Sequence, residues 1–471
     1  MTAEMRRAVE EFRVRAEGYV KSHGASGGLS FSSAQDVLHF VKEHGVKSIR
    51  VWFTDLLGFL KSFSITPAEL EGAFEEGMGF DGSSIQGYKR INESDMVAFP
   101  IPETAQLVPF TIGGSPAIRL FARIANPDGS DYVGDPRNIL KNQIERIGGY
   151  GFSHMNIGPE AEFFYFGSED EPLLLDQAGY FDLNPVDAGD DLREATIFCL
   201  ESMGITVEYS HHEVGPSQHE IDLKYAEAMT MADRLMTYKW LVKEVAQRVG
   251  VHATFMPKPL PMENGSGMHT HLSLFKDQNR NAFYAADEPY HLSSDARHFM
   301  AGILNHAREI CLVTNQWHNS YKRLVPGCEA PVYIAWAERN RSALIRVPLY
   351  KPGKEVATRI ELRFPDAACN PYIAFACMLS AGLHGLDVKE ALPEQMTMDL
   401  YKLDDIEREQ LDIRALPHDL YEAIQAARQS ELLAETLGED MRAKLIETKL
   451  SEYMRYRLAI SQMELGDYML L

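Results

Sequence analysis

The segment NGSGMHTHLSLF, residues 264–275, restricts the possible folds of this chain more than any other stretch. It begins as a glycine-rich turn and continues with polar and apolar side chains in alternation. Because successive residues of a strand point to opposite faces, His269, His271 and Ser273 share one face. Met268, Thr270, Leu272 and Leu274 share the other face. A polar strand face looks either at solvent or at something that binds polar groups.

Four further segments combine ionic groups on one strand face with apolar groups on the other. They contribute Glu160 and Glu162 in GPEAEFFYF, His211 and Glu213 in HHEV, Glu220, Asp222 and Lys224 in QHEIDLKY, and Arg359, Glu361 and Arg363 in RIELRF. For any one segment, the ordinary interpretation is an antiparallel strand with its polar face in water. The whole set favours a shared cavity, because these carboxylates stand among large apolar residues and buried carboxylates need cations.

The donor types indicate which metal such a cavity suits. Carboxylates with an occasional imidazole are typical ligands of Mg²⁺ or Mn²⁺, whereas zinc prefers cysteine and histidine. The stretch HHEVGPSQH, residues 211–219, is not the zinc motif H-E-x-x-H, and Pro216 would break the helix that this motif needs. We therefore expect a site for Mg²⁺ or Mn²⁺.

An arginine-rich stretch follows within this acidic chain. It comprises Lys322 and Arg323 in NSYKRLVPGCEAP, Arg339, Arg341 and Arg346 in ERNRSALIRVP, and Arg359 and Arg363. Surface ion pairing is the alternative for any one of them, but arginine is well suited to bidentate recognition of phosphate or carboxylate. Metals and arginines around one cavity are what phosphoryl transfer needs. The sequence contains no P-loop motif and no G-x-G-x-x-G, so a nucleotide would bind in an open, metal-lined cleft.

Composition argues against several classes of protein. The net charge of -22 repels nucleic acid and anionic lipid, so we expect neither as a partner. The 5 cysteines are scattered and form no C-x-x-C pair, which favours the cytoplasm. The first twenty residues resemble an amphipathic helix, not a signal peptide, and no apolar run reaches the roughly 18–20 residues of a membrane helix.

The chain is long enough for more than one domain. We expect a helical extension over residues 1–33, a small β-rich domain over 34–129 and a larger domain over 130–471, with NPDGSDYVGDPR at 126–137 as the boundary. Ser32 or Ser33 is expected to cap a second helix that ends near His44. KSIRVWF and FLKSFSI, separated by DLLG, predict a hairpin. An apolar helix is expected near 371–386, and charged amphipathic helices from about 418.

Six motifs in order carry a more specific resemblance. FDGSSIQGY, GPEAEFF, KPLPMENGSGMHTHLSL, NSYKRLVPG, NRSALIRVP and RIELRFPDAACNPY together resemble type I glutamine synthetase, collinearly from about residue 36 to the end. The short spacing from Glu162 to Gly179 is similar to the class without the inserted segment of the adenylylated enzymes. The resemblance implies an α+β fold: an N-terminal β-grasp domain, and a large α/β catalytic domain whose antiparallel sheet forms the active-site funnel. It also implies a homododecamer of two stacked hexameric rings, with active sites between subunits.

The resemblance implies the activity as well. ATP would convert the γ-carboxylate of L-glutamate to an acyl phosphate, and ammonia would displace the phosphate to give L-glutamine, with two or three Mg²⁺ or Mn²⁺ ions in the site. One metal site resembles Glu162, Glu213 and Glu220, and the other resembles Glu160, His269 and Glu361. Glutamate would contact Asn264, Gly265, Arg323 and Arg363. ATP would contact Glu208, Tyr225, His271, Ser273, Arg341, Arg346 and Arg359.

The remaining roles implied by the resemblance belong to loops. Asp81, with Ser84 beside it, would reach in from a neighbouring subunit and take a proton from ammonium, and Glu329 would close over the site. Arg341 and Arg363 complete the catalytic set, and Arg341 and Arg346 would stabilise the transferring group. Arg90 resembles a residue of feedback control by glutamine, with an ion pair to Glu93 or Asp95 as the alternative.

Three departures and two rival functions remain open at this stage. Cys328 stands where the family commonly has an aromatic residue, and the Arg346–Arg359 spacing leaves Lys351 and Lys354 without a role. Tyr401 aligns roughly with a tyrosine that is adenylylated in some relatives, but an exposed loop tyrosine is the ordinary interpretation. A γ-glutamyl-amine ligase would be expected to lose the Asp81 and Ser84 elements, and an inactive structural or regulatory member would lose metal ligands.

Overall fold

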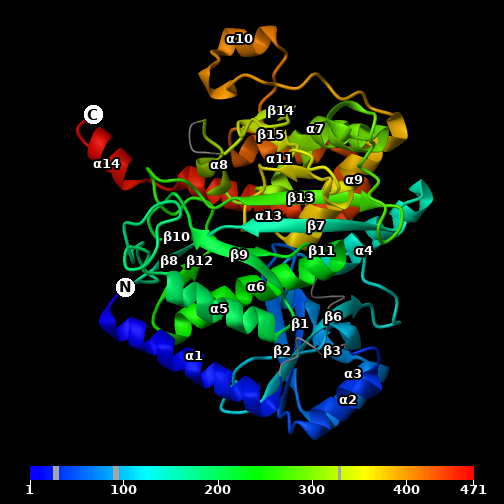
Figure 1. Ribbon diagram of the computed structural model, residues 1–471, viewed down its shortest axis with the longest axis vertical. Coiled ribbons are helices and arrows are strands. Elements are labelled where there is room, and N and C mark those ends of the chain that lie inside the picture. The colour runs from blue at the N-terminus through cyan, green and yellow to red at the C-terminus, as the bar shows by residue number, and fades with distance from the viewer. Residues whose placement is uncertain (25–30, 89–94, 327–329) are drawn as a thin grey trace.

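The computed structural model describes residues 1–24, 31–88, 95–326 and 330–471 of the chain. Figure 1 shows a smaller part near the N-terminus, drawn in blue to cyan, beneath a larger part that holds most of the helices. Arg90, Cys328 and Glu329, which the sequence singles out, lie outside the described residues. The feedback and loop-closure roles expected of them therefore stay predictions.

The smaller part is built on a mixed sheet with strand order β2-β1-β6-β4-β3, and β5 pairs with β6. The strands are β1 Ser48–Thr54, β2 Leu60–Ile65, β3 Met78–Asp81, β4 Asp95–Pro100, β5 Gln106–Leu107 and β6 Ala117–Ala125. The predicted hairpin is confirmed, since β1 pairs antiparallel with β2. In its turn, Asp55 Oδ1 accepts hydrogen bonds from the backbone N–H groups of Leu57 at 3.0 Å and Phe59 at 2.9 Å.

Both helices predicted near the N-terminus are present. Helix α1 covers Ala3–His23. Helix α2 covers Ala34–Glu43 and begins after Ser33, whose side chain accepts a hydrogen bond from the Asp36 N–H as an N-cap. Helix α2 and the short helix α3 (Leu70–Glu75) bury their apolar residues in one core with the sheet.

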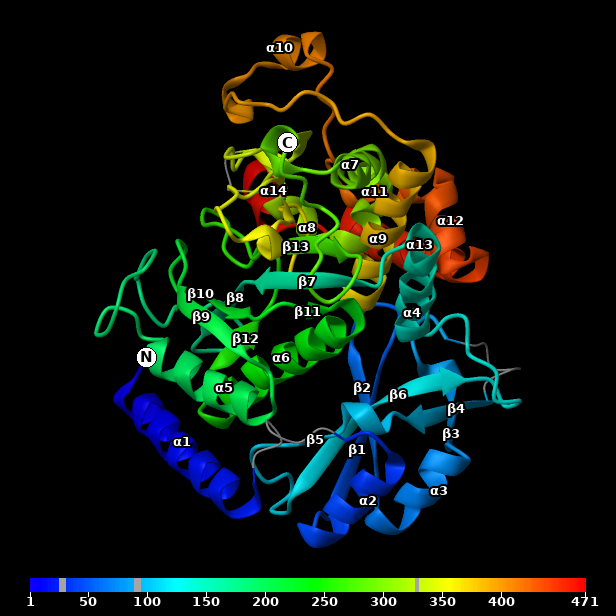
Figure 2. The same ribbon diagram turned by 45° about the vertical axis from the view of Figure 1, so that its right-hand side comes forward.

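Helix α1 packs against the larger part of the molecule. Its buried residues, Val9, Phe12, Ala16 and Tyr19, recur at helical spacing and so form one apolar face. This helix contacts α5 (Asp190–Ser202), and the two helices lie side by side in both views (Figures 1 and 2). The Phe12 ring also lies 5.9 Å from the Phe110 ring. The extension is therefore a packed part of the fold.

Two sheets form the framework of the larger part, with strand orders β11-β7-β13-β16-β15-β14 and β12-β8-β10-β9. The first sheet comprises β7 His154–Ala161, β11 Ala226–Glu227, β13 Met268–Phe275, β14 Tyr333–Ala337, β15 Ala343–Arg346 and β16 Ile360–Leu362. The second comprises β8 Phe163–Phe166, β9 Val207–His212, β10 Gln218–Leu223 and β12 His252–Thr254. Neighbouring strands run antiparallel, apart from the parallel pair β14 and β15.

Each alternating segment predicted from the sequence contains part of one of these strands, but Glu213, Lys224, Arg359 and Arg363 lie just beyond the strand ends. The sequence predicts a single strand through Glu160 and Glu162, but β7 ends at Ala161 and β8 begins at Phe163. Glu162 is the residue at which the chain passes from one sheet to the other, because β7 pairs with β13 whereas β8 pairs with β10. The crossing leaves Glu162 between the two sheets.

The larger part also contains α4 Pro136–Arg146, α6 Ala228–Arg248, α7 Ser294–Thr314, α8 Ser320–Arg323, α9 Pro371–Val388, α10 Asp405–Gln410, α11 Leu420–Gln429, α12 Glu431–Leu437, α13 Glu439–Leu458 and α14 Gln462–Tyr468. Most of these helices cover the outside of the sheets, whereas α10 and α14 project from the molecule (Figure 1). Helix α9 is the predicted apolar helix, and α11 to α13 are the predicted charged helices. Helices α7 and α9 approach closely because Gly302 and Gly385 face each other, where a Cβ on either would collide with the opposite backbone.

The two parts of the molecule share a buried interface. Trp52 of β1 packs edge-on against Trp240 of α6, with ring centroids 4.9 Å apart. Beside them, Arg119 of β6 donates to Thr237 Oγ1 at 3.1 Å. Core packing therefore holds the N-terminal sheet against α6. Among the described residues, no helix has the length and apolar character needed to cross a membrane.

The packing of α1 can be tested with two substitutions on opposite faces of the helix. We expect Phe12→Ala to lower the free energy needed to open α1 away from α5 by about 3 kcal/mol, because it removes a buried ring and leaves a cavity. Val14 is 61% exposed, so Val14→Ala should change that free energy by less than about 0.5 kcal/mol. Amide hydrogen exchange within α1 measures this free energy. Equal effects of the two substitutions would contradict the packing.

Candidate active site

The register of β13 between its neighbours assembles the first cluster of metal-ligand side chains. His269 lies directly opposite Glu160 of β7, and His271 lies directly opposite Glu361 of β16. Opposite residues of antiparallel strands point to the same face, so these four side chains converge. His269 Nδ1 lies 3.5 Å from Glu160 Oε2 and 4.0 Å from Glu361 Oε1. Glu160, His269 and Glu361, predicted as one ligand set, are close enough to hold one ion.

A second cluster lies on the β9–β10 hairpin and differs from the predicted set. It joins His211, Glu213 and Glu220, with His211 Nδ1 3.5 Å from Glu213 Oε1 and His211 Nε2 3.5 Å from Glu220 Oε1. Glu162, predicted in this set, lines the same cavity, but its Oε2 accepts from Gln218 Nε2 at 3.0 Å and from the Gly267 N–H at 2.8 Å. The sequence placed His211 on one strand face with Glu213, but the predicted ligand set did not include it.

Both clusters line one cavity of about 420 Å³, which we call the acidic cavity. Its walls also carry the four predicted substrate residues and two further predicted arginines. They are Asn264, Gly265, Arg323, Arg363, Arg341 and Arg346. Gly265 permits a close approach here, because a Cβ would collide with the Pro257 carbonyl and the Arg323 side chain. Arg323 is buried, and its two terminal nitrogens donate to the backbone carbonyls of Phe364 at 2.9 Å and Arg363 at 3.2 Å.

Carboxylates on the hairpin lack enough positive charge around them. Burial raises the pKa of Glu220 well above its ordinary value, and the neighbouring carboxylates Glu162, Glu160 and Glu213 raise it further. Burial, followed by the charge of Glu220, raises the pKa of Asp222 to about 10. Divalent cations would remove both effects by neutralising the site. The donor set thus fits the metal ions that the sequence predicts.

Carboxylates of the other cluster are held in the ionised form. Burial acts to raise the pKa of Glu160, but hydrogen bonds from His269 and His271 outweigh it and hold this pKa well below its usual range. Burial likewise opposes ionisation of Glu361, and the adjacent histidines and arginines overcome it and lower its pKa. Arg363 Nη1 lies 2.6 Å from Glu361 Oε1, and Arg346 pairs with the other oxygen.

A second cavity, of about 450 Å³, adjoins the acidic cavity through the shared residues Glu160 and Tyr209. We call it the adjoining cavity. It gathers most of the predicted ATP set: Glu208, Tyr225, His271, Ser273 and Arg359. His271 bridges its polar groups, since Nε2 lies 2.7 Å from Glu160 Oε1 and Nδ1 accepts from Arg359 Nε at 3.3 Å. Arg341 and Arg346, the other two ATP predictions, line the acidic cavity instead.

Other residues lie outside these cavities, or line them without having been predicted. Asp81 and Ser84 lie at the end of β3 and in the turn after it, and neither is among the described residues that line the two cavities. Tyr180 and Tyr209 line the acidic cavity without having been predicted. Tyr209 lies two residues before His211, which was a usable signal, whereas nothing local distinguishes Tyr180. Tyr401 is not a freely exposed loop residue, because its hydroxyl donates to the Ala330 carbonyl at 2.9 Å.

Comparison with known proteins places this geometry in a family. Residues 45–127 match the model of the glutamine synthetase β-grasp domain, and residues 133–468 match that of the glutamine synthetase catalytic domain. Glutamine synthetase from Mycobacterium tuberculosis is 48% identical over 439 residues, covering 92% of this chain and 98% of that protein. Glutamine synthetase from Methanosarcina mazei is 47% identical over 442 residues, covering 93% and 98%.

Solved structures agree with the sequence comparison. Plasmodium falciparum glutamine synthetase has a TM-score of 0.84 at 27% identity, covering 93% of this chain and 99% of that chain. A complex described as GmaS with ADP also has a TM-score of 0.84, at 29% identity, and covers 93% and 100%.

The chain combines a β-grasp domain with a catalytic domain that holds a carboxylate-lined cavity, and this combination is that of a ligase. The chain belongs to the glutamine synthetase family, in agreement with the resemblance found in its sequence. The catalytic domain and the glutamine synthetases that it resembles identify the chain as a glutamate–ammonia ligase, an activity that uses ATP and divalent metal ions.

The raised pKa of Asp222 predicts how pH affects the metal-free protein. Asp222 ionises near 3.8 when unfolded and near 10 when folded, so between these values the folded state binds more protons and stability falls as pH rises. We expect the Tm of the metal-free protein to fall from neutral to mildly alkaline pH. Asp222→Asn cannot ionise and should reduce that slope. Calorimetry with a chelator, repeated with saturating Mn²⁺, measures the slope of Tm against pH. An unchanged slope in metal-free Asp222→Asn would contradict the prediction.

Proposed function

We propose that this chain synthesises L-glutamine from L-glutamate, ammonia and ATP through γ-glutamyl phosphate, releasing ADP and phosphate. A γ-carboxylate oxygen of glutamate attacks the γ-phosphorus of ATP, and ADP leaves. The nitrogen of ammonia then attacks the acyl carbon, and phosphate leaves. The observation that carries the proposal is the junction of the two cavities at Glu160, where a nucleotide in one would present its terminal phosphate to a carboxylate in the other.

Two or three Mg²⁺ or Mn²⁺ ions belong to this proposal. Glu160, His269 and Glu361 would hold one, and Glu213 and Glu220 would hold another together with Glu162 or His211. When bound, these ions supply charge neutralisation for the phosphates. The convergence of these side chains, and the neighbouring carboxylates that raise the pKa of Glu220, support this assignment.

Arginines of the acidic cavity would orient the reacting groups. Arg363 and Arg346 are held by Glu361, which fixes their direction. Arg341 lines the same wall, so the three guanidinium groups would stabilise charge on the transferring phosphoryl group. Asn264, Gly265 and Arg323 would complete the glutamate pocket, where the buried Arg323 chiefly fixes the backbone next to Arg363.

The ammonia step would need a residue from a second copy of the chain. Ammonium has no lone pair, so a base must remove a proton before the nitrogen can attack. Asp81 and Ser84 carry this role in the proposal, and they lie on a different part of the chain from the acidic cavity. A neighbouring subunit in a homododecamer of two stacked hexameric rings would bring them to the site. Arg90 and Glu329 would add feedback control and closure.

The proposal places the enzyme in the cytoplasm. Cys199, Cys311, Cys369 and Cys377 are buried and free, which suits a reducing compartment that also supplies ATP. The net charge of -22 makes nucleic acid and anionic lipid unsuitable partners.

The choice of amine tests the proposed reaction. We expect phosphate release with ATP, Mg²⁺, glutamate and ammonium, and a loss of about a hundredfold or more in Asp81→Ala, because no base then takes the ammonium proton. Asp95→Ala is the matched control, since Asp95 is an exposed carboxylate directly opposite Asp81 in the β3–β4 pair. Release with a larger amine but not with ammonium would favour a γ-glutamyl-amine ligase. No release with any amine would favour a structural or regulatory protein.

The adjoining cavity gives a prediction about ATP. Tyr225 is 51% exposed on its wall and offers a ring face on which adenine can stack. A stacking contact of about 1–3 kcal/mol predicts that Tyr225→Ala raises the KM for ATP by about tenfold, with little change in kcat. Tyr225→Phe keeps the ring and should retain the original KM. Steady-state kinetics at saturating glutamate and ammonium compare them, and an equal rise in both variants would argue against stacking.

A further inference from the structure

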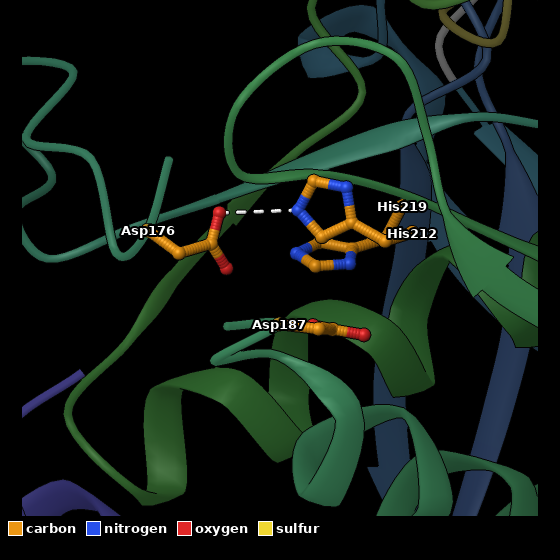
Figure 3. Close-up of side chains that lie close together, drawn as sticks. All are labelled: Asp176, Asp187, His212 and His219. Atoms are coloured by element: carbon orange, nitrogen blue, oxygen red, sulfur yellow. Dashed lines mark hydrogen bonds and ion pairs between the residues drawn. The ribbon is translucent and has the colours of Figure 1, made fainter. Parts of the chain in front are cut away.

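A buried cluster of two histidines and two aspartates lies behind the active-site hairpin. It comprises Asp176, Asp187, His212 and His219, which we call the His–Asp cluster, and its ligand-type atoms all lie within 4.8 Å of one another. Figure 3 shows the two imidazole rings close to the carboxyl groups of Asp176 and Asp187, with Asp176 bonded to one ring, and the two ring planes are inclined by 76°. His212 Nε2 lies 3.1 Å from Asp176 Oδ1. Outside the acidic cavity, this is where the described residues most resemble a metal site.

The direction of its hydrogen bonds argues against a metal ion. Arg193 Nη1 lies 2.9 Å from His219 Nδ1, and a guanidinium can only donate, so Nδ1 accepts and Nε2 carries the proton. The buried His219 Nε2 has no partner among the described residues and cannot ligate in this form. Asp187 Oδ2 accepts from Arg193 Nη2 at 2.7 Å. The cluster is therefore a network of opposite charges, with Asp187 paired to Arg193 and Asp176 paired to His212.

Glu213 lies in a turn between His212 and Ser217, and Asp176 contacts both ends of this turn. Before the turn, Asp176 pairs with His212, whose Nδ1 donates to the Glu213 carbonyl at 2.7 Å. After the turn, Asp176 Oδ1 accepts from the Ser217 N–H at 2.9 Å. Ser217 has a φ of 61°, a left-handed backbone conformation that needs external support in a residue other than glycine. The carboxylate thus spans the two ends of the turn.

The same turn connects directly to the acidic cavity. The Glu213 N–H donates to the Gln218 carbonyl at 2.8 Å, and Gln218 Nε2 donates to Glu162 Oε2 at 3.0 Å. On its other side, Asp176 Oδ2 accepts from the Ala188 N–H at 2.9 Å, which ties down the segment that carries Tyr180. One buried carboxylate thereby fixes two walls of the cavity.

We propose that Asp176 is a positioning residue that sets the geometry of Glu213 for metal binding, although it does not reach the metal site itself. This inference rests on the proposed role of Glu213 as a metal ligand. Replacing a residue that orients a metal ligand typically weakens metal binding by about tenfold or more. Asp176→Asn keeps the size of the side chain but removes the charge that faces His212.

Binding of Mn²⁺ to the metal-free protein, measured by isothermal titration calorimetry without substrates, tests this. We expect Asp176→Asn to weaken the tightest Mn²⁺ site by about tenfold, and the lost glutamine synthesis to be recovered by added Mn²⁺. Unchanged affinity in Asp176→Asn would overturn the inference.

Asp233→Asn is the matched control. Asp233 is also buried and paired, accepting from Arg137 at 3.2 and 3.1 Å and from the Tyr372 hydroxyl at 2.6 Å, but it lines neither cavity. It should lower Tm and leave Mn²⁺ affinity unchanged. An equal loss of affinity in both variants would show that Asp176 acts only through stability, and would overturn the inference.

Two further variants separate the possible failures. Glu213→Gln tests the ligand role directly: if it leaves Mn²⁺ affinity unchanged, the proposed ligand set and this inference both fail. If it weakens Mn²⁺ binding while Asp176→Asn does not, only the inference fails.

If Asp176→Asn does not fold, Ser217→Ala is the alternative variant. It removes the 2.8 Å hydrogen bond from the Leu175 N–H to Ser217 Oγ, next to Asp176. We expect it to weaken Mn²⁺ binding by about twofold, and unchanged affinity would overturn the inference.

Discussion

The site depends first on the register of β13 between β7 and β16. A strand presents alternate residues to one face, but that alternation alone does not bring carboxylates and imidazoles together. The pairing of His269 with Glu160 and of His271 with Glu361 does so. A shift of one residue in either pair would turn these side chains to the opposite face. The buried apolar face of β13, which includes Met268 and Leu272, favours this register because a shift would expose it.

The two clusters differ in how their negative charge is balanced. Side chains of the protein compensate the charge around Glu361, whereas the carboxylates around Glu220 need bound cations. Glu361 is buried between Arg346, Arg363 and His269, so its charge is compensated within the chain. On the hairpin, the neighbouring carboxylates Glu162, Glu160 and Glu213 raise the pKa of the buried Glu220. Buried like charges are costly without counterions. The arrangement is therefore stable as a metal-binding site and strained as an empty one.

The support for this site extends well beyond the residues that line it. Behind the hairpin, the His–Asp cluster joins the turn carrying Glu213 to the segment carrying Tyr180. Arg193, which completes the cluster, stands on α5, and α5 in turn carries the packed helix α1. On the other side, Trp52 and Trp240 join the β-grasp sheet to α6. Hydrophobic packing thus sets the positions of the elements, and buried hydrogen bonds set the directions of the side chains.

The sequence by itself determined what depends on neighbouring residues. Strand faces, the Ser33 cap and the hairpin at Asp55 were readable, because periods and turns are local properties of the chain. The ligand set Glu160, His269 and Glu361 was implied by the family resemblance of the sequence. Only the tertiary structure decided that His211 lies with Glu213 and Glu220, and that Asp176 spans their turn. It also decided that Glu162 stands between two sheets. These relations depend on how strands pair and how sheets and helices pack, which the neighbouring residues alone do not fix.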